Sequence, residues 1–386
     1  MSVTPEIYLD NAATTRPWPE AVAAVASAMG DRFGNASSLH RRGLAAARAI
    51  AEAQDAVAAL VGGGRWKVIF TSGGSEADAL AVLGAVPRGK RDALVTTTVE
   101  HSAVEEAGKR LAAQGARHVE IPAGARGVVD PAALEAAVDE RTALVSVTHV
   151  ANEMGTVQPV AEIAARAKAR APRCRVHVDA VQAAAQLARL DYPLEVDMVS
   201  ISAHKLHGPQ GVGALLVRPE VSLRPLLTGG DQQDGVRPGT LNLPGILGLG
   251  AAASLVTARR RDAVPRMAAL AARLISGACA VPGVRALGEP VARAPGIAVL
   301  AVEGVKAEVL LHALEMRGVL ASSGAACHAR RAEPPRCLRD AGLGRAEGAV
   351  RLSLSFDTTP DEIEFAVAAF AGAVDAVRAG SAGGGA

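Results

Sequence analysis

The chain has 386 residues, enough for two or three structural units at roughly 150 residues each. It carries 41 Lys and Arg against 39 Asp and Glu, and 2% of its residues are aromatic. These values predict neither a strong general field for nucleic acid or an anionic membrane nor many platforms for base stacking. The 4 cysteines are too few for a dense disulfide framework, so a cysteine that matters here is expected to be chemical.

The N-terminal sequence MSVTPEIYLDNAATT has no basic head followed by an apolar core, so it does not resemble a secretory signal. Apolar residues occur in short stretches that charged residues interrupt, and none approaches the roughly 20 residues of a membrane helix. We therefore expect a cytoplasmic protein that neither enters a membrane nor binds nucleic acid directly.

Through the first two-thirds of the chain, short β-rich runs alternate with alanine-rich helical stretches. The sequence predicts strands over 67–73, 92–101, 142–150, 175–182 and 196–205. Helices are predicted between them, over 75–86, 102–114, 131–140 and 159–171. This alternation predicts an α/β fold with a mostly parallel sheet flanked by helices.

The pattern changes after about residue 255. A helix is predicted over 266–280, followed by a strand over 296–302, a helix over 306–318, a strand over 350–356 and a helix over 362–378. We therefore expect a large domain over 14–255, a smaller α+β domain built from 1–13 and 256–378, and a flexible tail over 379–386.

Polar residues gather in the segments that end the predicted strands, where open α/β sheets place their ligands. They include His101, Asn152, Asp179, Gln182, Ser202, His204 and Lys205. TSGGSE lies where a strand gives way to a helix, so its backbone N–H groups and hydroxyls suit a phosphate. It lacks the GK[ST] ending of a nucleotide loop, and HKLH has no third ligand at a suitable spacing, so we expect neither ATP nor a metal.

These residues make sense together as a pyridoxal 5'-phosphate (PLP) site. That cofactor needs a lysine amine, a carboxylate beside its pyridine nitrogen, a phosphate cup and a flat group over its ring. Lys205, Asp179, TSGGSE and His101 supply these four features.

Nine motifs in chain order make the sequence resemble the cysteine desulfurases, a class-V aminotransferase-like branch of the fold-type I PLP enzymes. They are YLDNAATT, FGNASSLH, TSGGSE, VEHSAV, HVANEMGTVQP, VDAVQ, SAHKLHGPQGVG, RPGTLN and SSGAAC. The resemblance implies a large PLP-binding domain with a mostly parallel seven-stranded sheet, and a smaller α+β domain that carries the catalytic cysteine.

The resemblance also implies roles for individual residues. Lys205 would hold the cofactor, Asp179 would pair with its pyridine nitrogen, Gln182 with its phenolic oxygen, and His101 would stack on its ring. The phosphate cup would consist of Gly74, Ser75, Ser202 and His204. Thr240 would reach the phosphate of a neighbouring subunit, which implies a homodimer.

For the substrate, the resemblance implies that Asn152, Arg351 and Asn35 hold L-cysteine and that Lys205 moves its α-proton. Cys327 would attack the substrate sulfur, which leaves L-alanine and a Cys327 persulfide for a sulfur-acceptor protein. Of the other thiols, Cys174 and Cys279 lie in ordinary alanine-rich context. Cys337 stays open between a second reactive thiol and a packing residue.

Three segments depart from the family pattern. GNASS replaces GNPSS, RLSLSFDTT lacks the usual glycine-arginine pair after Arg351, and Gln233 stands where a glutamate is common. A selenocysteine lyase, a small-amino-acid aminotransferase and a non-catalytic sulfur-trafficking scaffold remain alternatives. The destination of the sulfur also stays open among iron–sulfur cluster assembly, tRNA thiolation, cofactor sulfuration and DNA phosphorothioation.

Overall fold

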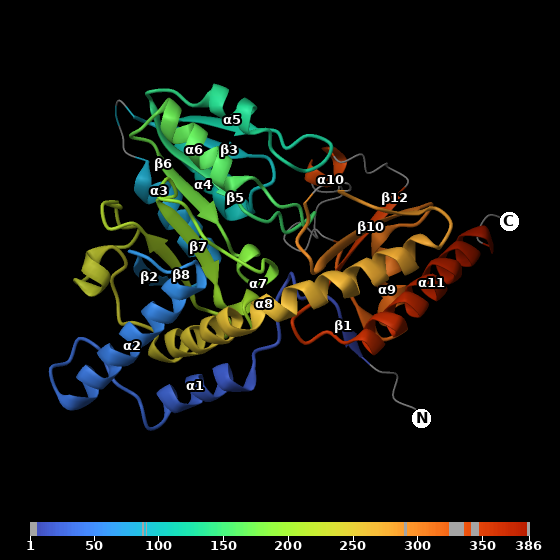
Figure 1. Ribbon diagram of the computed structural model, residues 1–386, viewed down its shortest axis with the longest axis horizontal. Coiled ribbons are helices and arrows are strands. Elements are labelled where there is room, and N and C mark those ends of the chain that lie inside the picture. The colour runs from blue at the N-terminus through green and yellow to red at the C-terminus, as the bar shows by residue number, and fades with distance from the viewer. Residues whose placement is uncertain are drawn as a thin grey trace.

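A computed structural model describes residues 6–86, 89, 91–288, 292–323, 336–340 and 347–383. A large sheet with its helices forms one end of the molecule and a smaller sheet with its helices forms the other. The long helix α8 (Leu243–Cys279) runs from one end to the other (Figure 1).

The large sheet has seven strands in the order β2-β8-β7-β6-β5-β3-β4. β8 runs antiparallel to both of its neighbours, and all the other pairs are parallel. In chain order the strands are β2 (Lys67–Thr71), β3 (Ala93–Thr97), β4 (Arg117–Ile121), β5 (Thr142–Thr148), β6 (Arg175–Asp179), β7 (Met198–Ser202) and β8 (Gly213–Val217). The expected mostly parallel seven-stranded sheet is confirmed.

Both faces of this sheet are covered, because its central strands are apolar on both sides. Leu144 of β5 packs in the cluster under α3 (Gly74–Ala85) and α4 (Ser102–Ala113). Its neighbour Val145 points to the opposite cluster. The remaining helices around the sheet are α1 (Pro19–Met29), α2 (Arg41–Leu60), α5 (Pro131–Ala137), α6 (Val160–Arg170) and α7 (Ala183–Gln186), with α1 and α2 packed against α8.

The smaller sheet is antiparallel, with the order β12-β10-β9. Its strands are β9 (Val284–Ala286), β10 (Ile297–Glu303) and β12 (Glu347–Ser353), and its helices are α9 (Ala307–Glu315), α10 (Arg336–Asp340) and α11 (Pro360–Gly383). Near the other end of the chain, β1 (Ile7–Tyr8) pairs in parallel with β11 (Val319–Leu320). The N-terminal segment therefore joins the C-terminal half of the chain.

Two sequence expectations differ from the observed elements. α8 passes without a break through residue 255 and through Pro265, so the helix expected over 266–280 is only its second half. The division of the chain at residue 255 thus stays a prediction. α11 continues to Gly383, so residues 379–383 of the expected flexible tail are helical.

The unusual RLSLSFDTT segment packs against the N-terminal region. Asp357 accepts a hydrogen bond from the indole Nε1 of Trp18 at 2.6 Å. The same indole stacks on His207, with 4.2 Å between ring centroids, and Phe356 lies 6.0 Å from it. Through Trp18, the segment that follows β12 is therefore packed against His207, two residues after Lys205.

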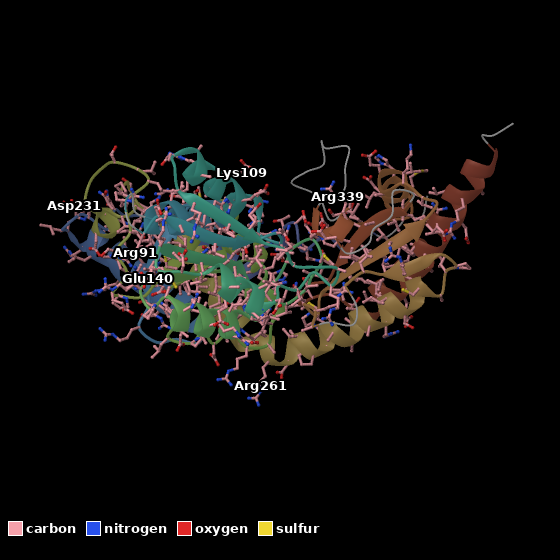
Figure 2. The ribbon with its side chains drawn as sticks, turned by 90° about the horizontal axis from the view of Figure 1, so that it is seen from above. Arg91, Lys109, Glu140, Asp231, Arg261 and Arg339 are labelled. Atoms are coloured by element: carbon pink, nitrogen blue, oxygen red, sulfur yellow. The ribbon has the colours of Figure 1, made fainter. Side chains whose placement is uncertain are left out.

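The surface is charged on the helices that cover the sheet. Figure 2 shows side chains such as Lys109 of α4 and Arg261 of α8 projecting outward. No helix among the described residues combines the length and the apolar character that crossing a membrane requires.

Gln233 closes the open edge of the large sheet. β2 is the edge strand, and its residue Phe70 directs both backbone groups away from β8. The Phe70 N–H donates to Gln233 Oε1 at 2.6 Å, and Gln233 Nε2 donates to the Phe70 carbonyl at 2.9 Å. A side-chain amide can both accept and donate in this way, whereas an ionised carboxylate only accepts.

We therefore expect Gln233→Glu to destabilise the chain by about 1–3 kcal/mol, because the Phe70 carbonyl loses its donor and faces a carboxylate. Urea unfolding measures the change. Gln232→Glu is the matched control, since Gln232 only accepts through Oε1, from the Gly239 N–H at 2.9 Å. Equal stability of the two variants would contradict the expectation.

Candidate active site

A cavity of about 410 Å³ opens at the carboxyl ends of β5, β6 and β7, between the two parts of the molecule. Most of the predicted site residues line it. They are Gly74, Ser75, His101, Asn152, Asp179, Gln182, Ser202, His204, Lys205 and Arg351. The fold thus brings together side chains from both halves of the sequence.

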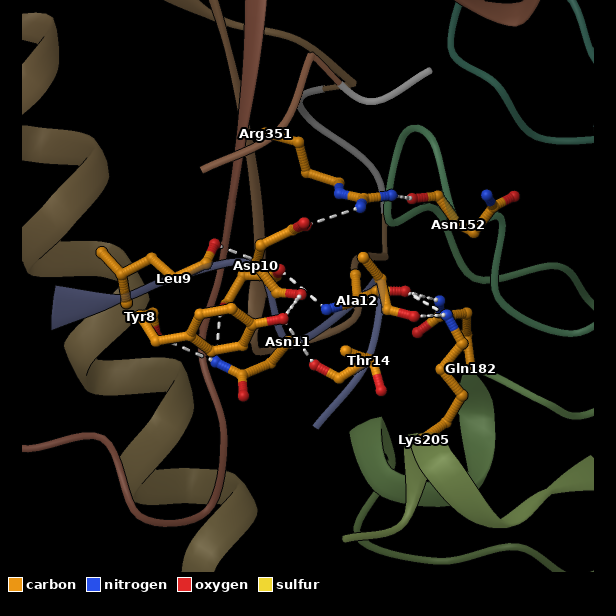
Figure 3. Close-up of polar contacts among 12 residues, drawn as sticks. Tyr8, Leu9, Asp10, Asn11, Ala12, Thr14, Asn152, Gln182, Lys205 and Arg351 are labelled. Atoms are coloured by element: carbon orange, nitrogen blue, oxygen red, sulfur yellow. Dashed lines mark hydrogen bonds and ion pairs between the residues drawn. The ribbon is translucent and has the colours of Figure 1, made fainter. Parts of the chain in front are cut away.

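Residues 8–15, here called the N-terminal strap, pass beside this cavity, and Ala12 and Ala13 line it. The carbonyl of Ala12 accepts hydrogen bonds from Lys205 Nζ and from Gln182 Nε2, the latter at 2.8 Å (Figure 3). Lys205 Nζ also donates to the Ala13 carbonyl at 2.7 Å. The lysine amine is therefore held at the centre of the site by main-chain groups, which no side-chain motif reveals.

Asp179 ends β6 as a buried carboxylate. Its Oδ1 accepts from the Val181 N–H at 2.9 Å, which turns the chain toward Gln182. Burial raises the pKa of Asp179, while the charges of His101 and Lys205 act in the opposite direction. A cation placed against this carboxylate would favour its ionised form further.

Two histidines flank the lysine. His101 caps the N-terminus of α4, where its Nδ1 accepts from the Ala103 N–H at 3.1 Å. The ring proton of neutral His101 therefore sits on Nε2. His204 lies 3.2 Å from Thr14 Oγ1 through its Nδ1, and burial, aided by the charges of Lys205 and His101, lowers its pKa to about 4. At neutral pH His204 is an uncharged hydrogen-bonding group.

The opposite end of the cavity suits a phosphate. The twelve-residue helix α3 begins at Gly74 and points its N-terminus at Ser202 and His204, which line the same space. A Cβ at Gly74 would lie 2.8 Å from Val181 Cγ2, so the small residue keeps this end open. Backbone N–H groups at a helix N-terminus bind anions well. The donor set therefore fits PLP, with a carboxylate, an amine and a phosphate cup in one cavity.

Arg351 enters the cavity from β12 and is almost completely buried. Its Nη1 donates to the Asn152 carbonyl at 2.8 Å, and its Nη2 pairs with Asp10 Oδ1 at 3.0 Å. Nε has no hydrogen-bond partner among the residues that the structure describes. Asn152 contacts the arginine through its backbone, while its side chain points away in Figure 3.

Three predicted residues are not part of this cavity as described. Asn35 lines a separate depression between the α1–α2 connection and the start of α8. Thr240 is exposed. Cys327 lies in 324–335, outside the described residues. The roles assigned to these residues stay predictions.

The residues on either side of 324–335 are anchored beside the cavity. Ser322 exchanges two backbone hydrogen bonds with Arg351, at 2.6 and 3.1 Å. Cys337 is buried in α10, and its Sγ lies 2.6 Å from Glu153 Oε2. Burial and the neighbouring carboxylate raise the pKa of the Cys337 thiol well above its ordinary value, which favours a packing role over a reactive one.

Sequence reasoning missed the buried acids beneath the cavity. Asp78 of α3 lines it, and Glu100 precedes His101, yet neither belongs to a pattern that marks a ligand. Asp78 Oδ1 and Glu100 Oε2 have no hydrogen-bond partner within the described part of the chain. Burial raises the pKa of both, that of Glu100 to about 8. Asp179 differs from these two acids because the charges of His101 and Lys205 lower its pKa, so it is the carboxylate best placed to carry charge.

Comparison with known proteins decides the family. The sequence profile described as Aminotransferase class-V matches residues 7–365. A cysteine desulfurase of Cereibacter sphaeroides is 43% identical over 382 residues, which cover 97% of this chain and 97% of the relative. The chain belongs to the cysteine desulfurase family. The predicted resemblance is thereby confirmed, and with it the assignment of desulfurase activity.

Solved structures agree with this desulfurase fold. A NifS-like protein superposes with a TM-score of 0.87 at 32% identity, covering 95% of this chain and 98% of its own. A structure described as SspA in complex with cysteine superposes with a TM-score of 0.80 at 28% identity, covering 92% of this chain and 100% of its own. Both likenesses extend over the two parts of the molecule.

The acid beneath the site generates a pH prediction. Glu100 has an ordinary pKa of 4.5 and a folded pKa of about 8, so its ionisation opposes folding increasingly as the pH rises through this window. Glu100→Gln removes that penalty and keeps an oxygen to accept from Thr97 and Thr148. We expect its stability advantage over the parent chain to grow by on the order of 1–3 kcal/mol between pH 5 and pH 8. Urea unfolding at both pH values measures it, and a pH-independent difference would contradict it.

The buried thiol generates a second prediction. Because the Cys337 thiol is buried and its pKa is raised, it should resist alkylation by iodoacetamide at neutral pH in the folded protein. Mass spectrometry of a Cys327→Ser variant should find Cys337 modified only after unfolding in urea. Half-buried Cys279 is the internal comparison. If Cys337 were labelled as fast as Cys279 in the folded protein, Cys337 would be a reactive thiol and the expectation would be wrong.

Proposed function

We propose that this desulfurase holds PLP in the cavity around Lys205 and transfers the sulfur of L-cysteine to Cys327, releasing L-alanine. The observation that carries the proposal is the convergence of a lysine amine, a buried carboxylate, an anion-binding helix start and a buried arginine on one cavity. The structure of SspA, described as a complex with cysteine, supports the same substrate for this related chain.

Different residues of the cavity would hold different parts of the cofactor. Lys205 would hold its aldehyde carbon and Asp179 its ring nitrogen, while Gln182 would reach its phenolic oxygen. Its phosphate would lie at Gly74, Ser75, Ser202 and His204. When bound, PLP withdraws electrons from the α-carbon of an attached amino acid.

The chain itself supplies position and proton transfer. Arg351 binds the substrate carboxylate, since its planar fork suits that group. Nζ of Lys205 takes the α-proton, and His101, which lines the same cavity, would lie over the cofactor ring. The Cys327 thiolate then forms an S–S bond to the substrate sulfur as the C–S bond breaks. The electron pair of that bond stays with the three-carbon fragment, which takes a proton at its β-carbon, regains its α-proton from Lys205 and leaves as L-alanine, while Cys327 retains a persulfide.

We infer that the chain acts as a homodimer and passes its sulfur to an acceptor protein. Thr240 is exposed on its own chain, and a depression of about 350 Å³ adjoins the phosphate end of the cavity, lined by Ser72, Gly73 and Gln210 among others. An exposed threonine from a second copy suits such an opening. The persulfide has to be collected by an acceptor, and a reducing compartment such as the cytoplasm keeps Cys327 ready to react.

Two variants test the proposal. Lys205→Ala should lose the visible absorbance of the lysine-linked cofactor, with the exposed Lys109→Ala as its control. Cys327→Ala should keep that absorbance but lose at least about 100-fold in sulfide release from L-cysteine, measured with a thiol reductant that frees sulfide from the persulfide, since the nucleophile is gone. Cys174→Ala, which removes a buried thiol elsewhere, should retain activity. Parental sulfide release by Cys327→Ala would refute the sulfur transfer and favour another reaction of the same fold, such as transamination.

A further inference from the structure

Arg351 is shared between the proposed substrate site and a carboxylate of the chain itself. Asp10, in the N-terminal strap, pairs with Nη2 at 3.0 Å, and the Asn152 carbonyl takes Nη1 at 2.8 Å. Figure 3 shows Asp10 and Asn152 approaching the guanidinium from different sides. Two of its three nitrogens are therefore engaged before any ligand binds.

The opposite charges of Asp10 and Arg351 cancel, and the pair lies at the edge of the cavity. The Arg351 side chain is 2% exposed and that of Asp10 is 21% exposed. Arg351 lines the cavity, whereas Asp10 stands behind it and is absent from the residues described as lining that space. Nη1 and Nη2 each carry a second N–H that these two contacts do not use, so these are the donors left for an incoming carboxylate.

We propose that Asp10 is a specificity residue, whose carboxylate offsets the charge of Arg351 so that simple carboxylates bind weakly. An amino acid is retained because its amino group is held as well, at the Lys205 end of the cavity. The inference rests on the proposed function, since it takes Arg351 as the site of the substrate carboxylate.

The physical basis is repulsion between like charges across one guanidinium. A ligand carboxylate at the remaining N–H groups of Nη1 and Nη2 lies within a few ångströms of the Asp10 carboxylate, in a pocket where charges are poorly screened. The attraction of Arg351 for the ligand is therefore reduced by the repulsion from Asp10. The same balance weakens the hold on the carboxylate of the alanine product and so aids its release.

Propionate, which has a carboxylate but no amino group, is the probe. We expect Asp10→Asn, which keeps an acceptor for Nη2 but removes the charge, to bind propionate on the order of tenfold more tightly than the parent. Asp10→Ala should tighten binding in the same direction, and Asp10→Glu should bind like the parent. The dissociation constant is measured by calorimetry on the cofactor-loaded chain and by competition with L-cysteine.

The matched control is Asp92→Asn, because Asp92 also pairs with an arginine, Arg141, at 2.9 Å and is 20% exposed. It should leave propionate binding unchanged. A gain in affinity is not a result that structural damage produces, so tighter binding confined to the two neutral Asp10 variants supports the inference. Unchanged or weaker binding in both variants overturns it.

Arg351→Met separates this inference from the proposed function. If Arg351→Met weakens propionate binding while the neutral Asp10 variants do not tighten it, the role of Asp10 is wrong and Arg351 remains the carboxylate site. If Arg351→Met leaves propionate binding unchanged, the inference fails with the assignment of Arg351. Sulfide release from L-cysteine by the parent chain tests the desulfurase reaction independently of either result.

Discussion

The hydrogen bonds from Lys205 and Gln182 to the carbonyl of Ala12 hold the site together. Lys205 follows β7 of the large sheet, whereas Ala12 belongs to a strap fastened to the smaller one. Asn11 Nδ2 donates to the Ser353 carbonyl at 2.8 Å, and the Ala12 N–H donates to Ser353 Oγ at 2.8 Å. The lysine amine is therefore positioned by a segment whose own place depends on β12, so the two sheets have to be assembled before the cavity exists.

Burial also sets the pKa values of the titratable groups below the cavity. Asp78, Glu100 and Asp179 all have raised pKa values because they are removed from water. His177 hydrogen-bonds Ser146 and Ser200 at 2.8 and 2.9 Å and stays neutral, since burial lowers its pKa to about 3. Asp179 is the acid of this group whose pKa the charges of His101 and Lys205 lower. This arrangement concentrates the negative charge where the proposed cofactor nitrogen would meet it.

The sequence predicted the elements that have a regular apolar pattern and the site residues that have a characteristic side chain. Strands such as β5 and β6 follow from their apolar runs, and the polar residues after them follow from the rule that parallel strands end at one edge. The strap contacts could not be predicted, because Ala12 contributes a carbonyl and has no distinctive side chain. The Asp10–Arg351 pair joins residues 341 positions apart, and nothing in either local pattern indicates it. α8 was only half predicted, since Pro265 normally argues for a break that its packing overrides.

Arg351 connects the two proposed ends of the reaction. Its side chain lies beside Asn152 and Asp10, and its backbone holds Ser322, where the chain leads toward Cys327. On the other side of that segment, Cys337 contacts Glu153, the residue after Asn152. The proposed carboxylate site thus lies near the described residues on both sides of 324–335. Because β12 bears Arg351 and also fixes the strap that holds Lys205, we expect a displacement of this strand to disturb the proposed carboxylate binding and the proposed proton transfer together.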